Sequence, residues 1–281
     1  MNSVAPSMRH RYLSTLEEEI AKLTAQIPDL VQSGAGVIPW SCPVPVFGDP
    51  ADSSIATVGL NPSNREFVDE NGRELDGPAR RFHTLKSLHL RSWSYATHQH
   101  VKQISESCRT YFARNPYDLW FKVLDRVIQG TGASFYPSPK KACHLDLVPF
   151  ATGDKWTSLS TSQRSMLLTR ARSCLPNLLA SSRIQLLVLN GAAVVREMQN
   201  AFQIRLAETR MLAWRLRRES ADAVPGVAYF GTSSRLAGID LGREIAILGY
   251  NHNLQSSFGV TRHVRTEIAR WIMTHAVDTC S

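Results

Sequence analysis

The feature that most limits the fold of this chain is a series of short apolar runs that alternate with longer helical stretches. The runs are rich in β-branched residues, as buried strands are, and they cover residues 44–48, 55–60, 144–148, 184–190, 227–231 and 244–250. The spacing of apolar residues predicts helices over residues 11–26, 76–92, 98–112, 117–129, 160–181, 191–217 with interruptions, and 261–275. This alternation predicts an α/β fold with a mostly parallel central sheet and helices on both faces.

The expected organisation is an N-terminal helical extension over residues 1–40, followed by one α/β domain over residues 41–281. A proline-rich connection follows the first helix and keeps the chain extended there. A length of 281 residues allows one or two domains, and α/β folds of this size are often single. We find no internal repeat, which excludes solenoids and propellers.

Composition excludes several classes of protein. The chain contains no run of about 18 apolar residues and does not start with the apolar stretch of a signal peptide, so we expect a soluble, cytoplasmic protein without membrane contact. Its five cysteines are widely spaced and include no C-x-x-C pair, which disfavours a disulfide framework, a zinc ribbon and an iron–sulfur cluster. His98 and His100 could begin a metal site, but this spacing suits a solvated helix start equally, and we expect no metal.

The net charge of the chain is +8. Such an excess attracts polyanions, either nucleic acid or an acidic membrane surface, although an arbitrary solvated surface explains it equally well before any motif is considered. Ligands of parallel α/β sheets bind beyond the carboxyl ends of the strands. The residues that follow the predicted strands are therefore the place to look for chemistry.

The first such junction follows the predicted strand 55–60. A glycine there permits close backbone approach, a proline fixes the turn, and an asparagine amide offers both a donor and an acceptor to a water or a base edge. An ordinary Asn-Pro turn remains the alternative. The residues singled out are Gly59, Leu60, Asn61, Pro62, Ser63 and, further on, Phe67.

The second and third junctions follow the strands 144–148 and 244–250. Asp146 stands among apolar residues, where a carboxylate is costly to bury unless something pairs with it or binds it. The third junction offers a histidine that can donate to a developing anion, an apolar residue that looks exposed, and arginines that can hold phosphate. Its candidates are His252, Leu254, Gln255, Ser256, Arg262 and Arg265.

As a set, these residues resemble the uracil-DNA glycosylase superfamily, specifically an atypical bacterial branch with an Asn-type water-activating motif. GLNPS at 59–63 is similar to that motif, and NHNLQSSFGVTRH at 251–263 is similar to the histidine-bearing DNA-intercalation loop of the family. HLDLVPF at 144–150 falls where the family has its pyrimidine-recognition strand. The resemblance spans roughly residues 40–275.

The chain also departs from the family pattern. The loop that usually reads His-Pro-Ser reads His252-Asn253-Leu254, and Asp146 stands where the best-known members have asparagine. The clustered cysteines of the iron–sulfur branches are absent from the sequence, and residues 205–218 form a basic segment without a counterpart.

The resemblance implies a monomeric, cofactor-independent enzyme that excises uracil from DNA and leaves an abasic site. His252 is then expected to donate to the uracil oxygen, Asn61 to orient the attacking water, and Phe67 or Phe82 to stack on the flipped base. Asp146 is expected to recognise the base, with Asn190 as the next candidate. The remaining candidates divide between the base pocket (Gly59, Leu60, Pro62, Ser63) and DNA contacts (Leu254 or Gln255 as the wedge, with Ser256, Arg262 and Arg265).

Two other functions fit the same residues. One is a protein of glycosylase fold that binds nucleic acid or abasic sites without turnover, because an asparagine at 61 is not a strong base. The other is an enzyme of free nucleotides or nucleosides, which would leave the positive charge and an apolar loop tip unexplained.

Overall fold

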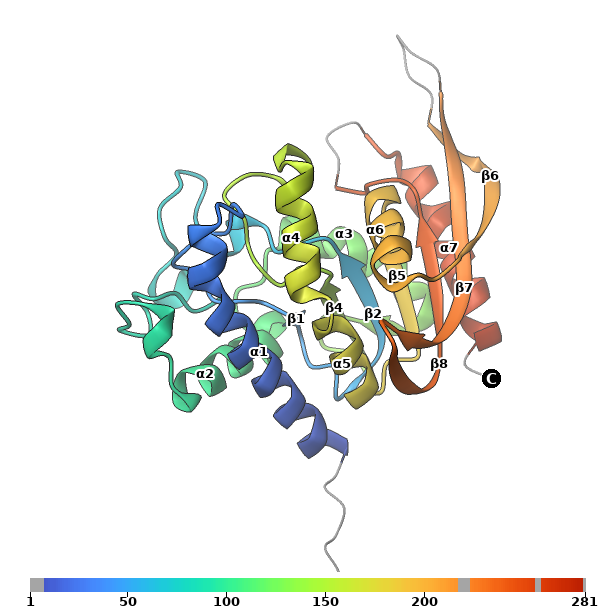
Figure 1. Ribbon diagram of the computed structural model, residues 1–281. Helices are drawn as coiled ribbons and strands as arrows, with labels where there is room; N and C mark the ends of the chain where they lie inside the picture. The colour runs from blue at the N-terminus through green and yellow to red at the C-terminus, as the bar shows by residue number, and fades with distance from the viewer. Residues whose placement is uncertain (1–7, 217–222, 256–258, 280–281) are drawn as a thin grey trace, which may run out of the picture.

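A computed structural model of the chain describes residues 8–216, 223–255 and 259–279 (Figure 1). Within these ranges the strands are β1 (Val46–Phe47), β2 (Ser53–Gly59), β3 (Ala133–Ser134), β4 (Lys140–Asp146), β5 (Leu186–Asn190), β6 (Ala207–Leu216), β7 (Val224–Leu236) and β8 (Ile239–Tyr250). The helices are α1 (Met8–Gln32), α2 (His98–Arg109), α3 (Asp118–Ile128), α4 (Thr161–Ala171), α5 (Cys174–Ser181), α6 (Ala192–Phe202) and α7 (Arg262–Thr279).

The described strands form one mixed sheet in the order β1-β4-β2-β5-β8-β7-β6, with β3 pairing beside β4. The α/β class is confirmed. The prediction of a mostly parallel sheet holds for its centre, since β4, β2, β5 and β8 run parallel. It is wrong at both sides, where β1, β7 and β6 are antiparallel to their neighbours.

The antiparallel pairing of β7 with β8 results from the short turn that connects them. Leu236 pairs with Ile239, so Ala237 and Gly238 alone connect β7 to β8. Both residues have positive φ, 50° and 81°, which is the backbone of the two-residue turns that favour hairpins. A hairpin returns the chain beside itself, so β7 cannot be parallel to β8.

Three predicted helices differ from the structure. Residues 76–92 are irregular with 3-10 turns, and Gly77 there has a φ of 51°, outside the helical region. In the stretch 191–217, α6 ends at Phe202, because the next residue, Gln203, has a left-handed φ of 56°, and the chain continues as strand β6. The predicted helix 160–181 is divided into α4 and α5, because Pro176 fits only the first turn of a new helix.

Helices cover both faces of the sheet. In Figure 1, α1, α4, α5 and α6 lie in front of the sheet, whereas α3 and α7 lie behind it. The central strands are covered on both sides and therefore read as continuous apolar runs; every residue of β5 is buried. No helix in the described part of the chain is long and apolar enough to cross a bilayer.

Candidate functional site

The register of the parallel strands brings the three predicted junctions to one edge of the sheet. Gly59 at the end of β2 pairs with Asp146 at the end of β4. On the other side of β2, Val58 pairs with Leu189, so Gly59 comes level with Asn190 at the end of β5. Asn190 in turn pairs with Tyr250 at the end of β8. Asp146, Gly59, Asn190 and Tyr250 therefore form a row across four strands, here called the carboxyl-edge row.

Gly59 leaves room in this row for the carboxylate beside it. A Cβ at Gly59 would overlap Asp146 Oδ1 and would come within 2.9 Å of His144 Nε2. Side chains alternate between the two faces of a strand, so His144 and Asp146, two residues apart in β4, lie on the same face of the sheet. The glycine of the GLNPS motif is thus required by the approach of Asp146.

Replacement of Gly59 by alanine should destabilise the protein by about 1–3 kcal/mol, because the added methyl group must displace Asp146 or its histidine partner. The free energy of unfolding in urea measures this effect. Gly153 is the matched control, since a Cβ there meets no atom within 4 Å. Equal unfolding free energies for Gly59→Ala and Gly153→Ala would contradict the proposed close packing.

A buried hydrogen-bonded chain fixes the Asp146 carboxylate. Thr57 Oγ1 lies 2.7 Å from His144 Nδ1, and His144 Nε2 lies 3.3 Å from Asp146 Oδ1. The three side chains are buried. The arrangement satisfies every member when the Thr57 hydroxyl donates to Nδ1 and Nε2–H donates to the carboxylate. Sequence analysis found Asp146 but missed Thr57 and His144, which the two-residue alternation of β2 and β4 could have indicated.

A second buried carboxyl group, Glu66, was also missed. It is 3% exposed. Tyr111 Oη donates a hydrogen bond of 2.7 Å to it, and Arg81 Nε lies 4.0 Å away. Burial raises the pKa of Glu66 to about 7, against the lowering effects of Tyr111 and Arg81, and the negative charge of Asp146 adds a smaller increase. The two carboxyl groups are thus close enough to interact.

Beside these groups lies a hollow of about 310 Å³, here called the edge hollow. The Trp120 ring centre is 4.9 Å from that of His144, and the Arg81 guanidinium lies 5.4 Å from the centre of the Tyr117 ring. Trp120 thus packs against His144, the hydrogen-bond partner of Asp146, and Tyr117 packs against Arg81, which lies near Glu66. Neither carboxyl group lines the hollow itself. The residues that line the hollow are Tyr117, Leu119, Trp120, Val123, Leu254, Gln255 and Arg265.

Two hydrogen-bond donors of the edge hollow have no partner within the described ranges. Gln255 Nε2 and Arg265 Nε are buried and make no hydrogen bond there. Gln255 is held in place through its other amide atom, since Asn190 Nδ2 donates to Gln255 Oε1 at 3.0 Å. A buried donor without an acceptor costs about 1–3 kcal/mol. An acceptor oxygen that gained access to these two buried atoms would remove this cost.

Asn61 lies just beyond the carboxyl-edge row, and its amide nitrogen is already hydrogen-bonded within the protein. Its amide nitrogen donates to Thr152 Oγ1 at 3.0 Å and to the Phe150 carbonyl at 3.3 Å. The amide nitrogen is thus engaged, and Asn61 Oδ1 is the side-chain atom left to accept a hydrogen bond from a bound molecule. The rest of the motif shapes the turn: the Leu60 carbonyl accepts from the Val148 backbone, Pro62 is buried, and Ser63 Oγ accepts from the Arg65 backbone.

The phenylalanines expected to stack on a base do not line the edge hollow. Phe67 and Phe82 are both buried, with ring centres 5.9 Å apart, and Phe67 also meets Trp40 edge-on. The aromatic residues that line the hollow are Tyr117 and Trp120.

His252 lies at the end of β8 as expected, but its N–H is occupied. Nε2 donates to the Trp214 carbonyl at 2.7 Å, and the side chain is buried. Burial lowers the pKa of His252, while this hydrogen bond acts in the opposite direction. The ring is therefore neutral at neutral pH, with its single N–H directed at β6. This corrects the expectation that His252 presents an N–H to the base.

The residues expected to contact DNA divide into three groups. The exposure predicted for Leu254 is wrong, since the side chain is 0% exposed and packs in the edge hollow. Arg262 is exposed at the start of α7, and Arg265 reaches the hollow. Ser256 lies outside the described residues, as do the last residues of the basic segment 205–218, most of which is strand β6.

No group of three or more histidine, cysteine, aspartate or glutamate residues within the described ranges is arranged to hold a metal ion. The chain matches no protein-family model and no curated protein.

Proposed function

We propose that the chain is a DNA glycosylase that hydrolyses the N-glycosidic bond of uracil in DNA and leaves an abasic site. The observation that carries this proposal is the edge hollow, which has two aromatic rings and two residues with unpartnered buried donors. One of its rings, Trp120, packs against His144, the partner of the buried Asp146. Flat rings bind the faces of a nucleobase, and N–H donors bind its carbonyl oxygens. A single glycosylase-like α/β domain is the corresponding proposal for the fold.

In this proposal a base stacked in the hollow reaches beyond the lining residues to Asp146, and the donors to its two carbonyl oxygens flank its N3–H. Asp146 can accept from the N3–H of the base, and its orientation is fixed by His144. Gln255 Nε2 and Arg265 Nε can donate to carbonyl oxygens. Stacking on Tyr117 or Trp120 adds affinity that does not depend on the identity of the base. The hydrogen bonds would then distinguish uracil from cytosine, which lacks the N3–H.

Cleavage requires only water as co-reactant. The water oxygen bonds to C1′ of the sugar as the bond between C1′ and N1 breaks, and the base leaves with the electron pair. Gln255 and Arg265 stabilise the negative charge that develops on the base, as donors fixed in a buried site do. Asn61 Oδ1 orients the water, and the proton that the water loses is finally taken up by the uracil anion.

A second candidate is a protein that binds abasic or uracil-containing DNA without turnover. The hydrogen bond from His252 to the Trp214 carbonyl favours it, because that N–H is not offered to a leaving group. An excision assay separates the two candidates: a uracil-containing oligonucleotide is incubated with protein in chelator, treated with alkali and resolved on a gel. Strand breaks at uracil support the glycosylase, and binding without breaks supports the second candidate.

Trp120→Ala should lower uracil excision by about tenfold to a hundredfold, since stacking of one base on an aromatic ring is worth about 1–3 kcal/mol. Single-turnover rates on the same oligonucleotide measure the change. Tyr95→Ala is the control, because Tyr95 is 67% exposed and does not line the hollow. If both variants cleave at the wild-type rate, the base does not occupy the edge hollow.

A further inference from the structure

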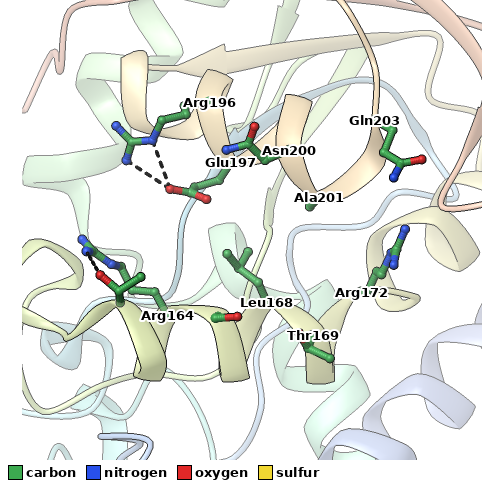
Figure 2. Close-up of a pocket in the computed structure, with 11 residues that line it drawn as sticks. Arg164, Leu168, Thr169, Arg172, Arg196, Glu197, Asn200, Ala201 and Gln203 are labelled. Carbon is green, nitrogen blue, oxygen red and sulfur yellow. Dashed lines mark hydrogen bonds and ion pairs between the residues drawn. The ribbon is translucent and has the colours of Figure 1, made fainter.

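A second hollow, of about 680 Å³, lies between α4 and α6 (Figure 2). These two helices are on the face of the sheet opposite α3 and α7 (Figure 1). Its volume falls within the range of about 300–1,000 Å³ that is typical of ligand sites. We call it the helix groove. The residues that line it are Thr161, Arg164, Ser165, Leu168, Thr169, Arg172, Arg196, Glu197, Asn200, Ala201 and Gln203.

The two helices turn polar faces toward each other. Neighbouring helices on one face of a sheet usually pack through apolar stripes at a separation of about 8–10 Å. Here the α4 face carries hydroxyl groups and two arginines, and the α6 face carries amides and a third arginine; Leu168 and Ala201 are the apolar residues between them. Polar faces that line a hollow instead of packing are suited to a polar ligand.

The groove carries a net positive charge. Arg164, Arg172 and Arg196 line it together with one carboxylate, Glu197. Arg196 Nη2 pairs with Glu197 at 3.0 Å. No ion pair of Arg164 or Arg172 occurs within the described ranges. Two guanidinium groups are thus left to attract an anion, and planar guanidinium groups match the oxygens of phosphate.

The groove begins at the edge of the sheet that carries the candidate site. The helix α6 starts at Ala192, directly after β5 ends at Asn190 in the carboxyl-edge row. Figure 2 shows Arg164 and Arg196 near one end of the groove, and Arg172 and Gln203 near the other. Arg164 and Arg172 are separated by about 12 Å along the helix axis. A chain of phosphates can contact both, whereas a single phosphate cannot.

We infer that the helix groove binds the phosphodiester backbone of single-stranded nucleic acid. The choice of nucleic acid as the anion rests on the proposed function. A strand that passes over the carboxyl edge can place one base in the edge hollow and continue along the groove on the other face. Arg164 and Arg172 hold its phosphates, and Asn200 and Gln203 offer hydrogen bonds to sugars or base edges.

The test measures binding of a fluorescent single-stranded oligonucleotide without uracil, by anisotropy at several salt concentrations. The variant Arg164→Glu/Arg172→Glu should bind at least tenfold more weakly at low salt. Its plot of log affinity against log salt should be shallower by about 0.7 for each phosphate that the variant no longer neutralises. Arg172→Gln, which removes one charge without reversing it, should show a smaller loss of affinity in the same direction.

Arg170→Glu is the matched control, because Arg170 is an exposed residue of α4 that does not line the groove. It should leave the salt slope at the wild-type value. Loss of affinity in the groove variants that merely equals the loss in Arg170→Glu would overturn the inference.

The use of uracil-free DNA separates this inference from the proposed function. If only the groove variants bind the oligonucleotide more weakly, and the wild-type protein releases no uracil, the groove inference is supported and the glycosylase proposal fails. If the protein releases uracil and the groove variants bind the strand as the wild type does, the groove inference fails and the glycosylase proposal stands.

Discussion

Asp146→Ala should lower the single-turnover rate of uracil excision by about 10²–10³-fold, the reduction typical of removing a fixed polar group from a transition-state site. The substitution removes the proposed acceptor for uracil N3–H and leaves His144 Nε2 without its partner. Discrimination between uracil and cytosine should fall as well, because N3–H is a feature of uracil alone. Rates on matched uracil and cytosine oligonucleotides measure both effects.

Asp146→Asn is the informative companion variant. Its amide oxygen can still accept from His144 and from uracil, and its NH₂ group can donate to a base oxygen. We therefore expect it to retain substantial excision. If the asparagine variant folds as the wild type does but is inactive at every pH, Asp146 needs its charge, and base recognition must be sought at Asn190.

Glu66→Gln should raise the free energy of unfolding relative to the wild type, and this gain should be about 2–3 kcal/mol larger at pH 8 than at pH 5. The folded pKa of Glu66 is raised from 4.5 to about 7. The folded state therefore holds a proton that the unfolded state has already lost in this range. The contribution of Glu66 to stability is full below about pH 4.5 and is lost as the pH rises through about 7. Glutamine stays neutral and can still accept from Tyr111.

Urea unfolding at both pH values measures this difference, and subtraction of the wild-type values removes the contribution of other titrating groups. Glu70→Gln is the control, since it makes the same charge change at an exposed position of the same loop. The quantity of interest is the unfolding free energy of Glu66→Gln minus that of the wild type. If it does not change with pH, or falls as the pH rises, Glu66 is ionised in the folded protein throughout this range.

The central part of the fold could be predicted from the sequence because burial on both faces leaves a direct signal. The run at 184–190 is continuously apolar, and it becomes β5 at the middle of the sheet. The runs at 55–60 and 244–250 likewise became the central strands β2 and β8. In parallel sheets the ends of such strands meet at one edge, so the locations of Asn61, Asp146 and His252 near that edge followed from topology alone.

The exposed strand β6 could not be predicted in the same way. Most of its residues face solvent, and Leu212 is 89% exposed, so no burial pattern marks it as a strand. Its arginine and leucine residues are good helix formers, which favoured a helix over this stretch. Pairing with β7, a contact distant in sequence, determines its conformation.

The side-chain partners at the site were also hidden from sequence reasoning. Glu66 occurs in a polar loop, where a charged residue is expected to be exposed, and only the fold brings Tyr111 and Arg81 to it. The same holds for His252, whose N–H is occupied by a carbonyl of β6. A motif can place a residue at a strand end, but it does not show which atoms are already bonded there.

The most direct test of the account measures free uracil released from DNA. Excess protein in chelator is mixed with a uracil-containing oligonucleotide, and the released base is identified by mass spectrometry while abasic sites are counted on the same sample. We predict one free uracil for each abasic site with the wild-type protein, and a rate at least a hundredfold lower with Asp146→Ala. Bound DNA with no free uracil, or equal release by the wild type and Asp146→Ala, would contradict it.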